Sequence, residues 1–154
     1  MDSELPPVGQ EGKLGNCLWF LYNQMSNSLA RKLEAVGVSV AEWMVLRELY
    51  QVGEASPSNL ARRLGLARGT VARITNRLKA KALLWCKSSL HKAHSHTLIL
   101  TTSGRHLVPK LDALSGQNDM EFFGHLLPQD QKVVERILKE IMAHCSPHPG
   151  EGAT

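Results

Sequence analysis

The segment from Ser56 to Leu84 constrains the fold of this chain more than any other part of its sequence. Ser56 is a favourable helix N-cap, and Pro57 suits the first helical position because proline lacks an N–H that a helix start leaves unpaired. Gly65 ends this short helix, and Leu66 fills the corner before a second helix begins. The segment therefore predicts two helices joined by a tight turn, which is a helix-turn-helix.

The second of these helices has one apolar face and one polar face. A rotation of 100° per residue places Val71, Ile74 and Leu78 toward a core, and the opposite face carries no large apolar side chain. Small residues let a helix approach the floor of a DNA groove, where Arg73 can pair with guanine and Asn76 with adenine or a phosphate. We therefore expect a recognition helix; an ordinary solvated amphipathic helix is the alternative.

Basic side chains are concentrated around this helix. Residues 55–100 contain nine Lys or Arg and no Asp or Glu, whereas the rest of the chain contains nine basic and 14 acidic residues. A solvated surface normally mixes both signs, and a block of one sign on a folded segment is typical of polyanion binding, since phosphate neutralisation releases counterions. The charge distribution favours double-stranded DNA as a partner.

Two β-prone segments, residues 83–88 and 95–101, follow the recognition helix and flank a polar tip. We interpret them as a hairpin, and a helix-turn-helix followed by a hairpin is a winged helix. Lys87, Lys92 and His94, in and around the tip, suit contact with phosphates or with an adjacent minor groove.

Apolar residues at helical spacing flank this winged helix on both sides. One such helix covers residues 12–36, another begins at Thr101 or Thr102, and Pro128 opens the last. Pro109 predicts a kink or break in the second of them. Their apolar faces are wider than one small domain can cover, so we expect a homodimer, in which a second copy covers them.

These elements predict a mainly α fold with a small β-hairpin wing. A capping box of Ser39 and Glu42 starts the helix that precedes the helix-turn-helix. The chain lacks a membrane-spanning run and a signal peptide, so we expect a cytoplasmic protein. From the N-terminus, we expect a disordered tail (residues 1–11), a dimerisation helix (12–37) and the winged helix-turn-helix (38–101). Two further dimerisation helices (102–145) and a second disordered tail (146–154) follow.

The order of elements, with the stretches LARRLGLARGTVARITNRLKAKALL and LTTSG, resembles the MarR family of transcriptional regulators. The resemblance identifies residues 12–145 as a MarR-like domain. It implies a homodimeric, DNA-binding regulator, usually a repressor, whose recognition helices enter successive major grooves of a palindromic operator. It also implies release of the DNA by a small ligand, often an aromatic acid.

The resemblance further implies which residues meet DNA. On the recognition helix these are Arg68, Gly69, Thr70, Ala72, Arg73 and Asn76, with Ser56 and Arg77 at phosphates. The wing departs from the family, because Lys92 and His94 stand where an Asp and an Arg are usual. Ala67 and Ala82 replace the usual N-cap and the usual Gly at the two ends of the recognition helix, which predicts weak helix termini.

Other residues suggest further sites. Met25, Trp43, Met44 and Arg47 are candidates for a ligand cavity, although Trp and Met at helical spacing more often form core or dimer interface. Cys17 suggests a thiol-responsive regulator; the alternative is that Cys17 is a small apolar residue of the core. A metal-responsive regulator is suggested by one cluster in the hairpin, although its spacing matches no closed zinc site: Cys86, His91, His94 and His96.

The sequence contains no pattern typical of an enzyme. There is no Gly-rich phosphate loop, nucleophile elbow, HExxH motif or paired-carboxylate arrangement, and we expect no cofactor and no metal. The remaining alternative to a DNA-binding regulator is a winged-helix module that binds protein or RNA.

Overall fold

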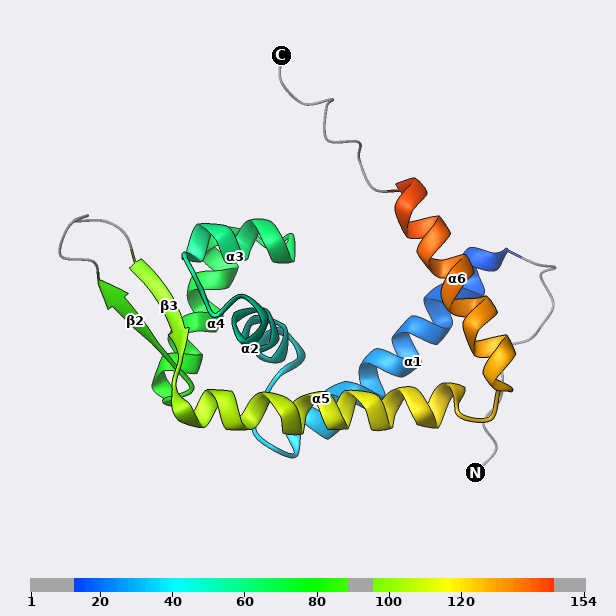
Figure 1. Cartoon of the computed structure of the whole chain (residues 1–154), viewed down its shortest axis with the longest axis horizontal. Coiled ribbons are helices and arrows are strands. Elements are labelled where there is room, and N and C mark those ends of the chain that lie inside the picture. The colour runs from blue at the N-terminus through cyan, green and yellow to red at the C-terminus, as the bar shows by residue number, and fades with distance from the viewer. Residues whose placement is uncertain (1–12, 89–95, 146–154) are drawn as a thin grey trace, which may run out of the picture. The chain divides into compact units, whose positions relative to one another are not determined.

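A computed structural model of the chain describes residues 13–88 and 96–145 (Figure 1). Both predicted tails and the tip of the wing, with His91, Lys92 and His94, lie outside the described residues. The described part forms two compact units, of which the first extends to Asn118 and the second begins at Asp119.

The described elements are mainly helical, with one small antiparallel sheet, as predicted. In chain order they are α1 (Leu14–Glu34), α2 (Val40–Val52), β1 (Glu54–Ala55), α3 (Pro57–Leu64), α4 (Arg68–Ala80), β2 (Leu84–Ser88), β3 (His96–Leu100), α5 (Thr102–Phe123) and α6 (Pro128–Cys145).

The helix starts follow the side chains that the sequence provides. Ser39 Oγ accepts from the Glu42 N–H at 3.1 Å, and Glu42 Oε2 accepts from the Ser39 N–H at 2.9 Å, which completes the predicted capping box of α2. Ser56 Oγ accepts from the Asn59 N–H at 3.1 Å and caps α3. Gly65 follows α3 in the left-handed conformation, with φ of 64°, and lets the chain turn into α4.

The sheet has the strand order β1-β3-β2. Strands β2 and β3 form the predicted antiparallel hairpin, in a register that pairs Leu84 with Leu100 and Trp85 with Ile99. Strand β1 pairs Glu54 with Ile99 on the other edge of β3. Strand β1 was not predicted, because a two-residue strand has no periodicity to detect.

Of the kink or break predicted at Pro109, the break is wrong, because α5 continues through this residue to Phe123. Proline removes one backbone donor from the helix, which costs stability in isolation. Val108 and Leu111, on either side of Pro109, are fully buried. Burial of this apolar face in the core stabilises the helix and compensates for the missing hydrogen bond.

One hydrophobic core lies in the first unit. It joins the apolar faces of α2, α3 and α4 to the inner face of the sheet and to α5, and it includes Leu33 from the end of α1. The largest apolar side chains fully buried there are Leu33, Leu46, Leu49, Leu60, Ile74, Leu78, Leu84, Leu98 and Leu111.

Candidate nucleic-acid interface

The recognition helix α4 has the orientation that its periodicity predicts. Val71, Ile74 and Leu78 are at most 1% exposed and pack in the core. The exposed outward positions are Arg68, Gly69, Ala72, Arg73, Asn76 and Arg77, and Thr70 is half-buried. A Cβ added at Gly69 would meet nothing within 4 Å, so the first turn of α4 is open to an approaching surface.

The preceding helix α3 adds two arginines to which the family resemblance assigns no DNA contact. Arg62 donates to Asn59 Oδ1 at 2.7 Å, and Arg63 pairs with Glu48 of α2. Arg62 and Arg68 also line one hollow of about 600 Å³ between α3 and the start of α4. The absence of acidic residues from positions 55–100 was the sequence signal for this wider basic surface.

On the wing, the described part of the hairpin presents Lys87 to solvent. Trp85 shares the outer face with Lys87, as alternate residues of a strand do, and is 48% exposed. The predicted wing contacts of Lys92 and His94 lie outside the described residues.

Behind the recognition helix, Glu42 is only 2% exposed although it is ionisable. Lys81 Nζ donates to Glu42 Oε2 at 2.7 Å and to the Gly37 carbonyl at 2.8 Å, and Arg77 Nε lies 3.8 Å from Glu42 Oε1. Burial raises the pKa of the Glu42 carboxyl. The hydrogen bonds from Lys81 and the Ser39 N–H, with the charges of Lys81 and Arg77, outweigh burial and hold this pKa below its ordinary value.

Both ends of α4 have the residues for which the sequence predicts weak termini. Ala67 occupies the N-cap position and provides no side-chain hydrogen bond. Ala82, one residue past the C-cap, has a φ of 56°, which L-residues with a Cβ rarely adopt. Thr101 supports this turn, since its hydroxyl donates to the Ala82 carbonyl at 2.7 Å and accepts from the Gly104 N–H at 3.0 Å.

This geometry has counterparts among known proteins. Residues 36–84, which include α2, α3 and α4, match the model of the MarR family. Over this segment the chain is similar to the MarR family. It is 25% identical, over 123 residues, to the HTH-type transcriptional regulator PrsX of Escherichia coli, with 79% of this chain and 74% of PrsX covered.

Solved structures share the fold. A cysteine-to-serine mutant of MarR from E. coli, complexed with operator DNA, superposes with a TM-score of 0.73 at 21% identity, covering 83% of this chain and 92% of that one. Bordetella bronchiseptica BpsR, solved in a study of how 6-hydroxynicotinic acid regulates its DNA binding, gives a TM-score of 0.75 at 22% identity, with coverages of 85% and 99%.

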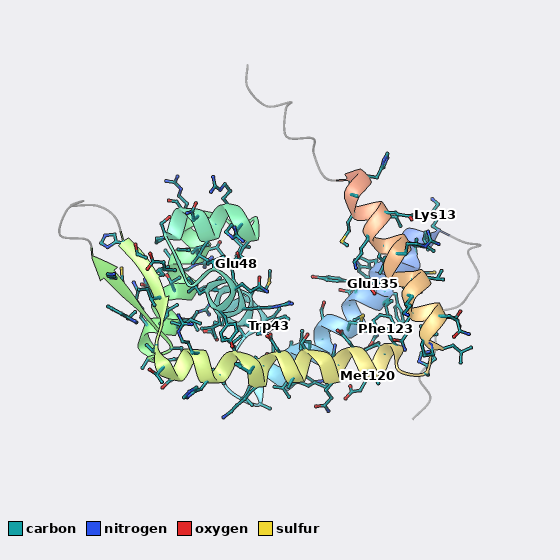
Figure 2. The ribbon with its side chains drawn as sticks, viewed as in Figure 1. Lys13, Trp43, Glu48, Met120, Phe123 and Glu135 are labelled. Carbon is teal, nitrogen blue, oxygen red and sulfur yellow. The ribbon has the colours of Figure 1, made fainter. Side chains whose placement is uncertain are left out.

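The candidate ligand residues of this MarR-type chain are only partly brought together. Trp43 lies on α2 (Figure 2). Its Nε1 donates to Asp112 Oδ1 of α5 at 3.1 Å. The Arg47 guanidinium lies 5.4 Å from the centroid of the Trp43 ring, and its Nε is 3.9 Å from Asp112 Oδ1. Trp43, Met44 and Arg47 line a hollow of about 260 Å³, whereas Met25 does not line it.

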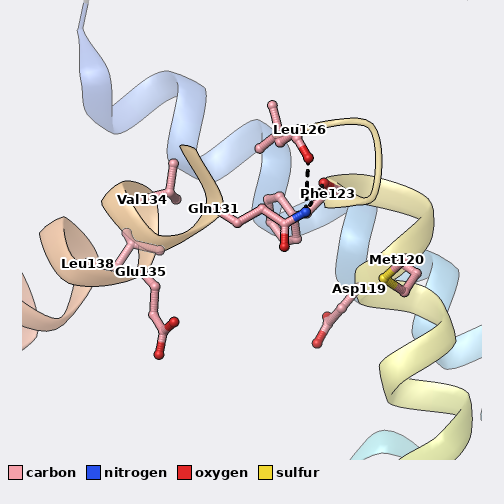
Figure 3. A pocket seen from close by; sticks show the side chains of 8 residues that line it. All are labelled: Asp119, Met120, Phe123, Leu126, Gln131, Val134, Glu135 and Leu138. Atoms are coloured by element: carbon pink, nitrogen blue, oxygen red, sulfur yellow. Dashed lines mark hydrogen bonds between the residues drawn. The ribbon is translucent and has the colours of Figure 1, made fainter. Parts of the chain in front are cut away.

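A second, more apolar pocket of about 330 Å³ lies in the second unit (Figure 3). It is lined by the last residues of α5, the connecting loop and α6: Asp119, Met120, Phe123, Leu126, Gln131, Val134, Glu135 and Leu138. The Gln131 side-chain amide donates to the Phe123 and Leu126 carbonyls at 3.1 Å, which ties α6 to the loop before it. Helix α6 has no buried residue.

The thiol and metal alternatives receive different support. Cys17 is exposed, so it is not the core residue that was the alternative to a redox role. Cys86 is half-buried on β2. Within residues 13–88 and 96–145, no three His, Cys, Asp or Glu side chains gather as a metal site requires.

None of the helices in the described ranges combines the length and the apolar character needed to cross a bilayer.

Proposed function

We propose that this MarR-type regulator is a homodimeric repressor that binds a palindromic operator in double-stranded DNA and is released by a small aromatic ligand. One observation carries the DNA-binding part of the proposal. The exposed face of α4, with Arg73 and Asn76, lies in a segment of nine basic and no acidic residues. Arginine and asparagine are the side chains that read guanine and adenine in the major groove, and the surrounding cations favour the phosphates.

The solved relatives support this assignment. The MarR structure that shares the fold of this chain was solved with operator DNA. An exposed, small-residue face on a helix-turn-helix fits a major groove, and an ordinary surface helix would carry acidic as well as basic side chains.

The apolar surfaces support a homodimer. Five large aliphatic residues of α6 are 38–45% exposed, namely Val133, Val134, Ile137, Leu138 and Ile141. The first two turns of α1 add Leu14 and Trp19, which are 65% and 69% exposed. A monomer rarely leaves so much apolar surface in water, and closed two-fold dimers are the commonest way to bury it. A second copy is therefore the partner that we assign to these faces.

The surroundings of Arg47 support the proposed ligand. A small aromatic carboxylate can compete with Asp112 for the Arg47 guanidinium and lie beside Trp43 and Met44 in the hollow that they line. BpsR, which shares the fold, is regulated by an aromatic acid of this kind, 6-hydroxynicotinic acid. Since Asp112 lies on α5 and Arg47 on α2, such a ligand would break a link between these two helices.

Fluorescence anisotropy tests the DNA-binding function. The full-length protein would be titrated onto labelled DNA from the intergenic region upstream of its own gene, and onto scrambled DNA of equal length, across a salt series. We expect a strong preference for the native fragment and a salt-dependent affinity for both. Equal, weak and salt-sensitive binding to both would contradict the regulator and favour a nonspecific or protein-binding winged helix.

Light scattering tests the homodimer. We expect the mass of a dimer for the native chain and that of a monomer for Ile137→Glu, because a carboxylate on the exposed apolar face of α6 must be desolvated in the interface. Gln129→Glu, at the start of the same helix, is the matched control and keeps the dimer. A monomeric native chain would contradict the assignment.

Tryptophan fluorescence tests the ligand. In a Trp19→Phe, Trp85→Phe background, added 6-hydroxynicotinic acid should change the emission of Trp43 and lower operator affinity. Arg47→Met keeps the aliphatic stem, removes the charge and should abolish both effects. An unchanged response in this variant would exclude Arg47 from the site.

A further inference from the structure

The Glu42 carboxylate is an unusual feature of this chain, because it is buried behind the recognition helix and faces two cations of that helix. Its side chain is 2% exposed, whereas those of Lys81 and Arg77 are 39% and 61% exposed. Isolated buried charges are costly, so this carboxylate depends on its partners. Its role as a capping-box residue requires only the Ser39 N–H and does not explain the two cations.

Lys81 is the C-cap residue of α4, and Arg77 lies one turn before it. Lys81 also donates to the Gly37 carbonyl in the turn between α1 and α2. Through these contacts, the first turn of α2 and the preceding loop hold the last turn of the recognition helix. A cation at this position also interacts favourably with the partial negative charge at the C-terminal end of the helix.

The helix needs such support because its own termini are weak. No side-chain cap fixes the first turn at Ala67, and the chain leaves α4 through Ala82 in the left-handed region. A helix of 13 residues that lacks an N-cap side chain and ends in a turn with a strained Ala82 is only marginally stable by itself, and tertiary contacts then determine its position.

We propose that Glu42 is a positioning residue for DNA recognition. Through Lys81 and Arg77 it holds the last turn of α4, so that Arg73 and Asn76 meet the base edges in one register. The inference rests on the proposed operator binding. Arg77, whose Nε faces Glu42, stays exposed enough to reach a phosphate beside the groove.

The DNA affinities of Glu42→Gln distinguish a positioning role of Glu42 from a simple effect of its charge. Glu42→Gln removes a negative charge close to the DNA-binding surface, which by electrostatics alone raises affinity for any polyanion. Loss of positioning lowers only the affinity that depends on base readout. On specific DNA the two effects therefore have opposite signs, whereas on scrambled DNA only the charge effect acts.

The experiment measures the affinity of full-length wild type and Glu42→Gln for a duplex selected by the wild-type protein and for its scrambled version. We expect the preference for the selected duplex to fall about tenfold, with unchanged or higher affinity for scrambled DNA. A tenfold change is near the low end of the coupling energies typical between two sites, and we expect it to be small because Lys81 and Arg77 are partly exposed to solvent. Glu54→Gln, an exposed acid of β1, is the control with the same charge change and should keep the preference.

A double-variant cycle identifies the partner. Lys81→Met should also lower the preference, and Glu42→Gln with Lys81→Met should cost about as much as either change alone, because both remove one contact. Equal loss on both DNAs, or an unchanged preference in Glu42→Gln, would overturn the positioning role.

Hydrogen exchange of the free protein keeps this test separate from the proposed function. Glu42→Gln should accelerate amide exchange in residues 78–82, at the end of α4, and Glu54→Gln should not. If wild type shows no DNA preference, the proposed function fails, and faster exchange still supports the holding contact. Unchanged exchange would overturn that contact whatever the DNA result.

Discussion

Ala82→Gly is expected to stabilise the protein, although glycine usually destabilises. Ala82 has a φ of 56°, and the left-handed conformation costs a residue with a Cβ about 1–2 kcal/mol. Glycine removes that cost but adds about 0.5–1 kcal/mol of backbone entropy to the unfolded chain. Ala82 takes part in two hydrogen bonds of this turn: its N–H donates to the Lys79 carbonyl, and its carbonyl accepts from the Thr101 hydroxyl. Both bonds survive the change to glycine.

The net gain is about 0.5–1 kcal/mol, which raises the melting temperature by about 1–4 °C for a chain of this size. Thermal and urea unfolding at matched protein concentration would measure it, because the stability of the proposed dimer depends on concentration.

Ala72→Gly is the matched control for this prediction. It makes the same substitution on the exposed side of the α4 interior, where glycine is expected to cost about 1 kcal/mol. Opposite signs for the two variants would establish strain at Ala82. If Ala82→Gly lost as much stability as Ala72→Gly, the left-handed strain would be refuted.

Three further predictions concern the same helix and its supports. The stability that Glu42 contributes should be fully present above its ordinary pKa of about 4.3 and lost as pH falls through its lowered folded value, so wild type and Glu42→Gln should converge in urea unfolding only at low pH. Thr101→Val should cost about 1–2 kcal/mol in the same assay, since it removes the cap of Gly104 and the partner of the Ala82 carbonyl; an unchanged midpoint would contradict this. Arg73→Ala should weaken operator binding by about 1–3 kcal/mol and relax its sequence preference, whereas Lys92→Ala should weaken all sequences alike; equal loss on specific and random DNA from Arg73→Ala would exclude base readout.

Local patterns predicted the helices and their faces well. Ser39 with Glu42 and Ser56 with Pro57 mark the starts of α2 and α3, and both caps are formed. Apolar spacing placed Val71 inside and Arg73 outside α4, because a helix turns by a constant angle whatever it packs against. The assignments of individual residues to DNA, ligand and dimer remain predictions.

Where the outcome depended on partners distant in the sequence, local patterns were insufficient. Pro109 predicted a break, but burial of Val108 and Leu111 keeps α5 continuous. Arg47 was a candidate for a ligand cavity, and only the structure shows that Asp112 of α5 lies beside it. Strand β1 forms because Glu54 and Ala55 pair with β3, and a pattern of two residues cannot predict this pairing.

The sequence by itself determined the order of the elements, the polar face of α4, the basic segment around it and the weakness of its two ends. These properties depend on residue type and on fixed helical or strand geometry, which are local. The tertiary structure alone decided that Glu42, 39 residues before Lys81, is buried against the last turn of the recognition helix. Burial and ion pairing arise from packing between segments, and a capping-box pattern specifies only the four residues that it spans.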